Sequence, residues 1–168
     1  MDTKQLTLRF AWFDEAERLT EVAHAAKSFW GYAARDIERW RDELTFTPEL
    51  IDRWPTWVAV FDDAVAGVAQ LRTEPEFELE ALWVDPSAIG QGVGRQLVSC
   101  VFKEVIQRKG IRLLIDADPN AEDFYLRLGT ARIGEIAAPT SSDPERIRPL
   151  LSLSISDFRG ENVKPVKP

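Results

Sequence analysis

The spacing of apolar residues along the chain predicts an alternation of strands and helices. Leu6 to Trp12 has the short apolar pattern of a strand. Asp14 and Glu17 are spaced as a capping box at the start of a helix. That helix has an apolar face at a period of 3.6 residues, formed by Ala16, Leu19, Val22, Ala23, Ala26 and Trp30. The first part of the chain therefore predicts a strand followed by an amphipathic helix.

The alternation continues after a stretch rich in Trp and Arg, residues 31–54, in which we expect one or two short helices. Three strands of a meander are predicted at 57–61, 65–72 and 77–84. They are followed by a long helix at 92–109, a strand at 111–117, a short helix at 120–128 and two closing strands at 132–136 and 151–155. Pro139, Pro144 and Pro149 are expected in the loop between the closing strands. This order predicts an α/β domain.

The strongest chemical signal lies where the meander meets the long helix. The chain there reads Leu82-Trp83-Val84-Asp85-Pro86-Ser87-Ala88-Ile89-Gly90-Gln91-Gly92-Val93-Gly94-Arg95. Glycine adopts positive φ and lets a ligand approach the backbone, so the three alternating glycines can present bare N–H groups at a helix N-terminus. No lysine follows them as in a Walker A loop, and Arg95 or Leu97 stands where a dinucleotide fingerprint needs its last glycine. The pattern predicts a site for a phosphate or a pyrophosphate.

A second segment follows one helix and one strand later: Ile115-Asp116-Ala117-Asp118-Pro119-Asn120-Ala121-Glu122-Asp123-Phe124-Tyr125-Leu126-Arg127-Leu128-Gly129. Together the two segments resemble the GNAT superfamily of acyl-CoA-dependent N-acetyltransferases. That family has V-x-P and Q/R-x-x-G-x-G/A at a helix start, then a strand, Asn and a short helix with Phe-Tyr and Leu-Gly. Two positions depart from the family pattern: Ile89 replaces the first Gln or Arg, and Thr130 replaces a Phe.

The resemblance implies a fold and a domain organisation. We expect one GNAT domain over residues 1–160, with residues 161–168 as a disordered tail. Its central sheet should be mixed, mostly antiparallel and twisted, with about six to seven strands and helices on both faces. The resemblance also implies a V-shaped split between two neighbouring strands.

The resemblance further implies acetyl-CoA as the acyl donor and assigns residues to it. The backbone of Gln91 to Arg95 would hold the pyrophosphate, and Arg95 either adds a charged contact or is a solvated helix residue. Leu82, Trp83 and Val84 would pair with the pantetheine arm, or else simply complete the sheet. Asn120 would hold the pantetheine or cap its own helix. The expected cofactor-binding set is Leu82, Trp83, Val84, Ile89, Gly90, Gln91, Gly92, Val93, Gly94, Arg95, Asn120 and Phe124.

Catalytic candidates follow from the same resemblance. Tyr125 is the candidate general acid, because a phenol with a pKa near ~10 can protonate a departing thiolate; packing against the sheet is the alternative role. Candidate bases are Glu78, Glu80, Asp116 and Asp118. We select Glu80, which lies nearer the expected slot than Glu78. The alternatives are a water chain in place of a dedicated base, and Glu80 as an exposed strand residue without a catalytic role. Trp30 and Tyr32 are the expected substrate-pocket residues, with Trp83 as a further candidate.

Composition narrows the classes of partner. No apolar run approaches the ~20 residues that a membrane-spanning helix needs, and the N-terminus lacks the apolar core of a signal peptide. The net charge of −7 argues against nucleic-acid binding. One Cys and one His offer no metal cluster, and the single Cys100 fits a reducing cytoplasm.

The sequence therefore predicts a cytoplasmic enzyme that acetylates a primary amine of a small molecule by direct attack in a ternary complex. Two alternatives are acetylation of a protein or peptide amine, and a non-enzymatic acyl-CoA-binding module. Because dimers are common in the family, a homodimer is compatible with this interpretation.

Overall fold

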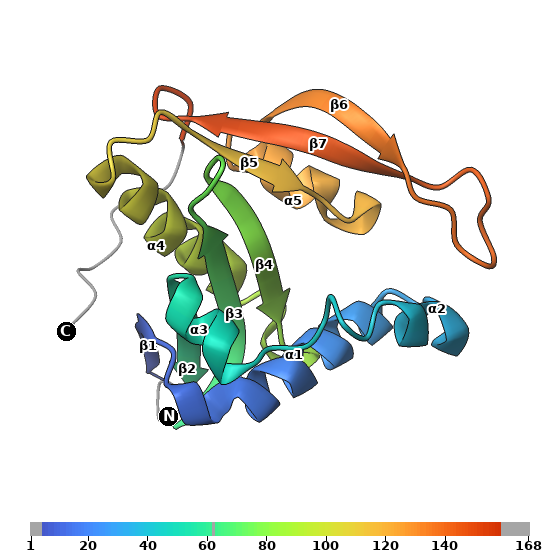
Figure 1. The fold of residues 1–168 in the computed structure, drawn as a ribbon, viewed down its shortest axis with the longest axis horizontal. Helices are drawn as coiled ribbons and strands as arrows, with labels where there is room; N and C mark the ends of the chain where they lie inside the picture. Colours follow the sequence, from blue (N-terminus) through green and yellow to red (C-terminus); the bar gives the residue numbers. More distant parts are fainter. Residues whose placement is uncertain (1–4, 62, 159–168) are drawn as a thin grey trace.

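The computed structural model describes residues 5–61 and 63–158, and its elements follow the predicted order (Figure 1). The strands are β1 (Leu6–Phe10), β2 (Thr56–Phe61), β3 (Ala64–Arg72), β4 (Glu78–Val84), β5 (Arg112–Asp116), β6 (Ala131–Ala137) and β7 (Ile147–Ser154). The α-helices are α1 (Ala16–Phe29), α2 (Ala34–Arg39), α3 (Pro48–Arg53), α4 (Val93–Gln107) and α5 (Glu122–Arg127). Short 3₁₀ turns precede three of them: η1 (Phe13–Glu15), η2 (Pro86–Ala88) and η3 (Pro119–Ala121). The expected tail, 161–168, lies outside the described residues.

All seven strands belong to one sheet, in the order β1-β2-β3-β4-β5-β7-β6. Every pair is antiparallel except β4 with β5, which is parallel. Within the described residues, β4 and β5 are in register only at Glu78 and Leu114, and the two strands then diverge (Figure 1). The mixed, mostly antiparallel sheet and its V-shaped split are thus as predicted.

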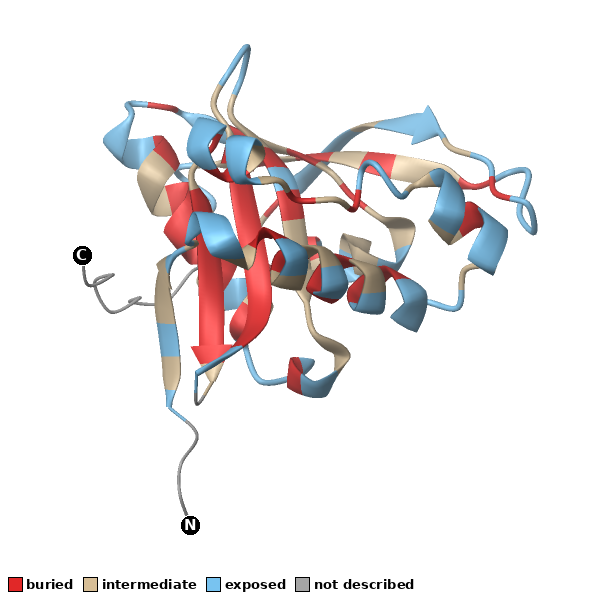
Figure 2. Cartoon of the chain, turned by 60° about the horizontal axis from the view of Figure 1, so that its bottom comes forward, coloured by how far each residue is buried: buried red, intermediate tan, exposed pale blue. Residues whose placement is uncertain are grey.

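Two apolar cores hold helices against opposite faces of the sheet. Buried residues are concentrated on the central strands (Figure 2). One core joins α4 to the sheet through residues such as Leu97, Val101 and Leu71. The other joins α1 through Leu19 and Val22. Both α1 and α4 contact β4, and they belong to different cores.

A β-bulge in β4 sets which side chains face α1. The register against β3 shifts between Gln70 and Leu71, which oppose Ala81 and Leu79. Leu79 therefore packs in the α4 core, whereas Ala81, two residues later, packs in the α1 core. A bulge places one extra residue on a strand and re-aims its neighbours. Here the extra residue is Glu80.

Several local predictions need correction. The first strand ends at Phe10, not at Trp12. The capping box is formed by Glu15, whose carboxylate accepts from the Trp12 N–H at 2.8 Å, and not by Asp14 and Glu17. Helical structure begins earlier than expected, because η1 directly precedes α1. The first N–H groups that need a capping partner therefore lie near Trp12.

Two further expectations fail nearer the split. Pro149 lies inside β7 and not in a loop. The Pro149 carbonyl accepts from the Ala117 N–H at 3.0 Å. Proline has no N–H to donate, and at this position an N–H would point toward the chain just after the end of β5. Trp30 does not continue the buried face of α1, because the helix ends at Phe29 and the Trp30 side chain is 42% exposed.

Candidate active site

The loop between β4 and α4 has the backbone of an anion site. Gly90 and Gly92 have φ of +80° and +78°, and a Cβ added to either would meet no atom within 4 Å. Gly92 is the N-cap of α4, and the first helical bond runs from the Gln96 N–H to its carbonyl at 3.1 Å. The N–H groups of residues 93–95, between Gly92 and Gln96, come before the first helical hydrogen bond and point out of the helix end. These N–H groups, with the open space beside Gly90 and Gly92, suit a pyrophosphate.

The loop is held by its own contacts. The Asp85 carboxylate caps η2 by accepting from the Ser87 N–H at 3.0 Å. The Gln91 side chain donates to the Ser87 carbonyl at 3.0 Å, so it braces the turn. Val93 is buried and anchors the helix start, whereas Ile89 and Arg95 are exposed beside the glycines. The shape of the loop is therefore built before any ligand binds.

The second sequence segment lies directly against this loop. A Cβ added at Gly94 would lie 3.2 Å from Phe124 Cζ and 3.7 Å from Val84 Cγ2. Gly94 thus lets α5 and the end of β4 approach the start of α4 closely. The structure brings together the two motifs that the sequence separates by one helix and one strand.

Tyr125 is next to Phe124, with ring centroids 5.0 Å apart, and it is buried in the α4 core. Burial raises the pKa of its phenol, and the negative charge of Asp118 raises it further. The hydroxyl therefore stays protonated at neutral pH. A phenol in that state can donate a proton, which is the role expected of Tyr125.

A cavity of about 300 Å³ opens on the α1 side of the split. Its walls come from α1, the segment between α2 and α3, β4, β5 and the start of β7. The lining residues are Lys27, Trp40, Glu43, Leu44, Glu78, Leu79, Glu80, Trp83, Asp116, Asp118, Arg146 and Arg148. Leu82 and Val84 pack toward the α4 core instead. Beyond the bulge, Trp83 therefore faces the cavity while its neighbours face α4.

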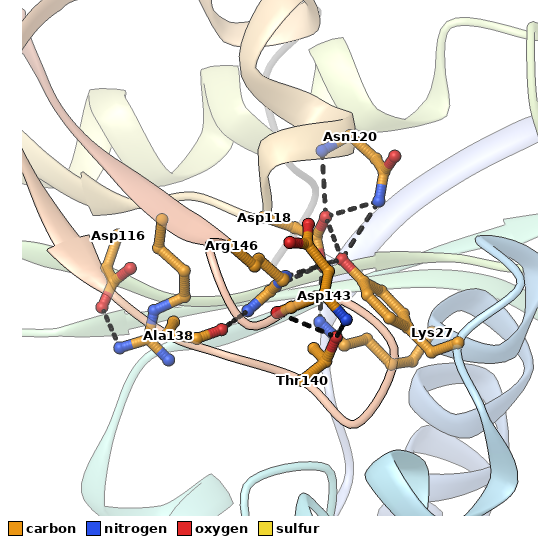
Figure 3. A network of polar contacts seen from close by, with 10 residues as sticks. Lys27, Asp116, Asp118, Asn120, Ala138, Thr140, Asp143 and Arg146 are labelled. Atoms are coloured by element: carbon orange, nitrogen blue, oxygen red, sulfur yellow. Dashed lines mark hydrogen bonds and ion pairs between the residues drawn. The ribbon is translucent and has the colours of Figure 1, made fainter.

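One end of the cavity is built around Asp118, just after β5 (Figure 3). Its carboxylate accepts from Lys27 Nζ at 2.6 Å, from the Tyr32 hydroxyl at 2.9 Å and from Arg146 Nη2 at 3.4 Å. The Asn120 side-chain amide donates to both Asp118 and the Tyr32 hydroxyl. Burial alone would raise the pKa of Asp118, but the Lys27 charge and these hydrogen bonds hold it below its usual value. This Asp118 network joins α1, β5 and the loop before β7.

The aromatic residues at this end surround a cation of the chain itself. Lys27 Nζ lies 4.4 Å from the centroid of the Trp40 ring and 4.7 Å from that of the Tyr32 ring. Burial lowers the pKa of Lys27, while Asp118 opposes that shift. Burial and Asp118 raise the pKa of Tyr32 to about 12. Tyr32 therefore shapes the cavity through the Asp118 network, whereas Trp30 packs edge-on against Phe29 and does not line it.

The other end carries the carboxylates considered as bases. Glu78 forms an ion pair with Arg72, and Glu80 Oε2 lies 3.1 Å from Arg72 Nε. Burial raises the pKa of Glu78, Arg72 opposes this shift, and the negative charges of Glu80 and Asp116 add to it. Glu80 is the more exposed of the two, with 44% of its side chain accessible. Both glutamates face the cavity, so the choice of Glu80 stays a prediction and Glu78 stands beside it.

The cations of the cavity are the residues that sequence reasoning missed. Lys27 lies on the apolar face of α1, between Ala23 and Trp30, and a lysine at such a position is a signal for a buried partner. Arg146 directly precedes β7, and Arg148 lies within it. Their partners are Asp118, just after β5, and Asp116, the last residue of β5, and no local pattern shows that pairing.

A split sheet with an anion loop at its edge, and a cavity with acids and a buried tyrosine beside it, is suited to an acyl-CoA-dependent transferase. The model of the acetyltransferase (GNAT) family matches residues 13–130. The chain belongs to this family. It is therefore an acyltransferase that uses acetyl-CoA and transfers the acetyl group to an amine.

Solved structures of similar fold cover nearly the whole chain. A GCN5-related N-acetyltransferase from Rhodopseudomonas palustris is 19% identical with a TM-score of 0.74, covering 92% of this chain and 98% of that one. The PaiA N-acetyltransferase from Thermoplasma acidophilum, solved with coenzyme A, is 18% identical with a TM-score of 0.72 over 89% and 99% of the two chains. The ribosomal-protein-S18-alanine N-acetyltransferase from Escherichia coli is 18% identical with a TM-score of 0.68 over 95% and 99%.

No helix within residues 5–61 and 63–158 is long and apolar enough to cross a membrane. No group of three or more His, Cys, Asp or Glu side chains there is arranged to hold a metal ion.

Proposed function

We propose that this acetyltransferase acts on a primary amine of a small molecule. The observation that carries the proposal is the cavity of about 300 Å³ on the α1 side of the split. This volume is at the lower end of the range for small-molecule pockets. The Asp118 network closes one end of the cavity with side chains from three parts of the chain. A concave site of this size suits a small amine better than a segment of a folded protein.

The residues around the glycine loop are proposed to bind the acyl donor. The N–H groups at the start of α4, with Ile89, Gly90, Gln91 and Arg95 around them, would hold the pyrophosphate. The part of β4 that has left β5, residues 82–84, has backbone groups suited to pair with the pantetheine arm as an added strand would. Phe124 would lie against that arm and Asn120 at its edge. One N–H of β4 would polarise the thioester carbonyl.

The proposed reaction uses two side chains for proton transfer. Glu80 takes a proton from the substrate ammonium, and the amine nitrogen then forms a bond to the acetyl carbon. The bond from that carbon to sulfur breaks, and the sulfur leaves with the electron pair. Tyr125 donates a proton to the sulfur and regains one from the nitrogen, so one proton is released per turnover. Tyr125 is proposed for this role because it lies beside Phe124 at the start of α4; burial keeps its phenol protonated, although the raised pKa also makes it a weaker acid.

The test is release of free CoA thiol from acetyl-CoA in the presence of small amines. Tyr125→Phe should lower kcat by about 10²–10⁴-fold, the usual contribution of a general acid, and leave the affinity for acetyl-CoA unchanged. Glu80→Gln should lower the rate most at pH values below neutrality, where the acceptor amine is protonated and hydroxide is too scarce to replace the base. Glu78→Gln is the matched control, because Glu78 is two residues before Glu80, on the other side of Leu79, and shares the same arginine.

The outcomes separate the alternatives. Full activity of Tyr125→Phe would remove Tyr125 as the acid. A larger loss in Glu78→Gln than in Glu80→Gln would assign the base to Glu78. Acetylation of peptide N-termini, with no small amine accepted, would refute the small-molecule assignment and favour a protein substrate.

A further inference from the structure

Charge is unevenly distributed along the cavity. Glu78 and Glu80 share one guanidinium, that of Arg72, so this end has one negative charge in excess. It lies where β4 and β5 are still paired, because Glu78 is in register with Leu114. At the other end Lys27 and Arg146 share one carboxylate, that of Asp118, which leaves one positive charge in excess. The cavity therefore has excess negative charge at the point of the split and excess positive charge at the end built around Asp118.

The middle of the cavity is neutral and polar. Arg148 Nη2 and Asp116 Oδ2 form an ion pair at 2.9 Å. The other Asp116 oxygen, Arg148 Nε and Trp83 Nε1 are buried, and none has a hydrogen-bond partner among the described residues. Buried polar atoms without partners are rare and costly in folded proteins. Their concentration in residues that line one cavity points to a polar guest and not to an apolar one.

The aromatic rings do not offer a second cation site. Trp40, Tyr32 and Trp83 surround Lys27, with ring centroids 4.4, 4.7 and 6.0 Å from Nζ. A guest ammonium at these rings would have to displace Lys27 or bear its repulsion. The Lys27 ammonium has three N–H donors, and the bond to Asp118 uses one. This end of the cavity therefore suits an anion. Glu43 at the rim opposes that charge, but it is exposed and screened by water.

We infer that the amine acceptor also carries a carboxylate, as an amino acid does. Its ammonium would face Glu78 and Glu80 beside the point of the split, and its carboxylate would face Lys27 and Arg148. The inference rests on the proposed function, because it names the class of small amine that the same cavity takes. A simple monoamine would leave the positive end uncompensated, and a diamine would place a second ammonium against Lys27 and Arg146. The zwitterion matches both ends.

The test compares each acceptor with uncharged and decarboxylated partners. A panel of α- and ω-amino acids is assayed by thiol release, each beside its carboxamide and the amine that lacks the carboxylate. The wild type should prefer the best amino acid over its carboxamide by about tenfold or more in kcat/KM, the value of one charge-assisted hydrogen bond. The preference should appear chiefly in KM, because the carboxylate is remote from the reacting nitrogen.

Two variants test whether the excess positive charge at the Asp118 end of the cavity causes the preference for a carboxylate. Lys27→Gln removes the excess charge and leaves Asp118 paired with Arg146, so the ratio of carboxylate to carboxamide kcat/KM should fall toward one. Arg148→Gln should also lower this ratio, and it tests the inference if the first variant fails to fold. The matched control is Arg132→Gln on β6, whose arginine pairs with Glu122 and Glu135 and does not line the cavity. It should keep the wild-type ratio.

Two failures are distinguishable. If decarboxylated amines react as well as amino acids, or if Lys27→Gln and Arg148→Gln both keep the wild-type ratio, the inference is overturned and the proposed function stands. If no small amine of any charge releases thiol, the proposed function falls and the inference falls with it.

Discussion

The clearest test of the glycine loop is a pair of substitutions, Gly92→Ala and Gly31→Ala. Both glycines have φ of +78°, and a Cβ at either position would meet no atom within 4 Å. Gly92 is the N-cap of α4, whereas Gly31 follows α1 and donates its N–H to the Ser28 carbonyl at 3.1 Å. The two sites therefore impose the same intrinsic backbone strain on alanine. They differ in that only Gly92 belongs to the proposed pyrophosphate loop.

The expected magnitudes follow from this match. The left-handed conformation costs an L-residue about 1–2 kcal/mol, so each variant should lose that much free energy of unfolding. In a chain of 168 residues this corresponds to a fall in Tm of about 2–8 °C. Only Gly92→Ala adds a methyl group in front of the loop N–H groups. The loss of one charge-assisted hydrogen bond there would raise the Kd for CoA by about tenfold or more.

The assay combines thermal denaturation with calorimetric titration of CoA into each variant. Equal losses of stability, with weakened binding in Gly92→Ala alone, would locate the anion site at the start of α4. Unchanged binding in a destabilised Gly92→Ala would refute the reasoning, because the loop would then hold no pyrophosphate. Weak binding in both variants would mean that strain, and not position, decides the affinity.

Two other predictions concern buried ionisable groups. Burial raises the pKa of Cys100 to about 11, so the folded protein should not react with a thiol reagent at pH 8, and one equivalent should react after denaturation. Asp118→Asn should lower the free energy of unfolding by about 3–5 kcal/mol in urea titrations, because it leaves Lys27 and Arg146 buried without their anion. The folded pKa of Asp118 lies below its unfolded value of about 3.9, so its contribution is complete above that pH and is lost as pH falls through the folded pKa. Urea titrations from pH 6 to pH 3 should therefore show a smaller acid loss in Asp118→Asn than in the wild type, and equal losses would contradict this role.

Local patterns were sufficient for the order of elements and for the glycine loop. The strands and helices follow from apolar periodicity, and Gly90 and Gly92 have the positive φ that alternating glycines favour. The split between β4 and β5 followed from the family resemblance and not from periodicity. These features depend on neighbours along the chain or on a recognisable motif.

The cavity could not be predicted in the same way. Lys27 and Asp118 are 91 residues apart, and neither segment indicates the other as its partner. The bulge at Glu80 depends on pairing with β3, so the alternation of Glu-Leu-Glu-Ala does not show which side chains face α1. Tyr32 was expected to hold a substrate, yet its ring and that of Trp40 lie beside Lys27, a residue to which the sequence analysis assigned no role. Long-range pairing of polar groups decided these features.

The measurement that tests the central claim most directly is calorimetric titration of acetyl-CoA into the protein, with dephospho-CoA and ATP as controls. Micromolar binding of acetyl-CoA with one site per chain, weakened by Gly92→Ala and kept by Gly31→Ala, is the predicted result. Absence of binding at millimolar acetyl-CoA would contradict the account, because the loop at the start of α4 would then have the shape of a CoA site without its function.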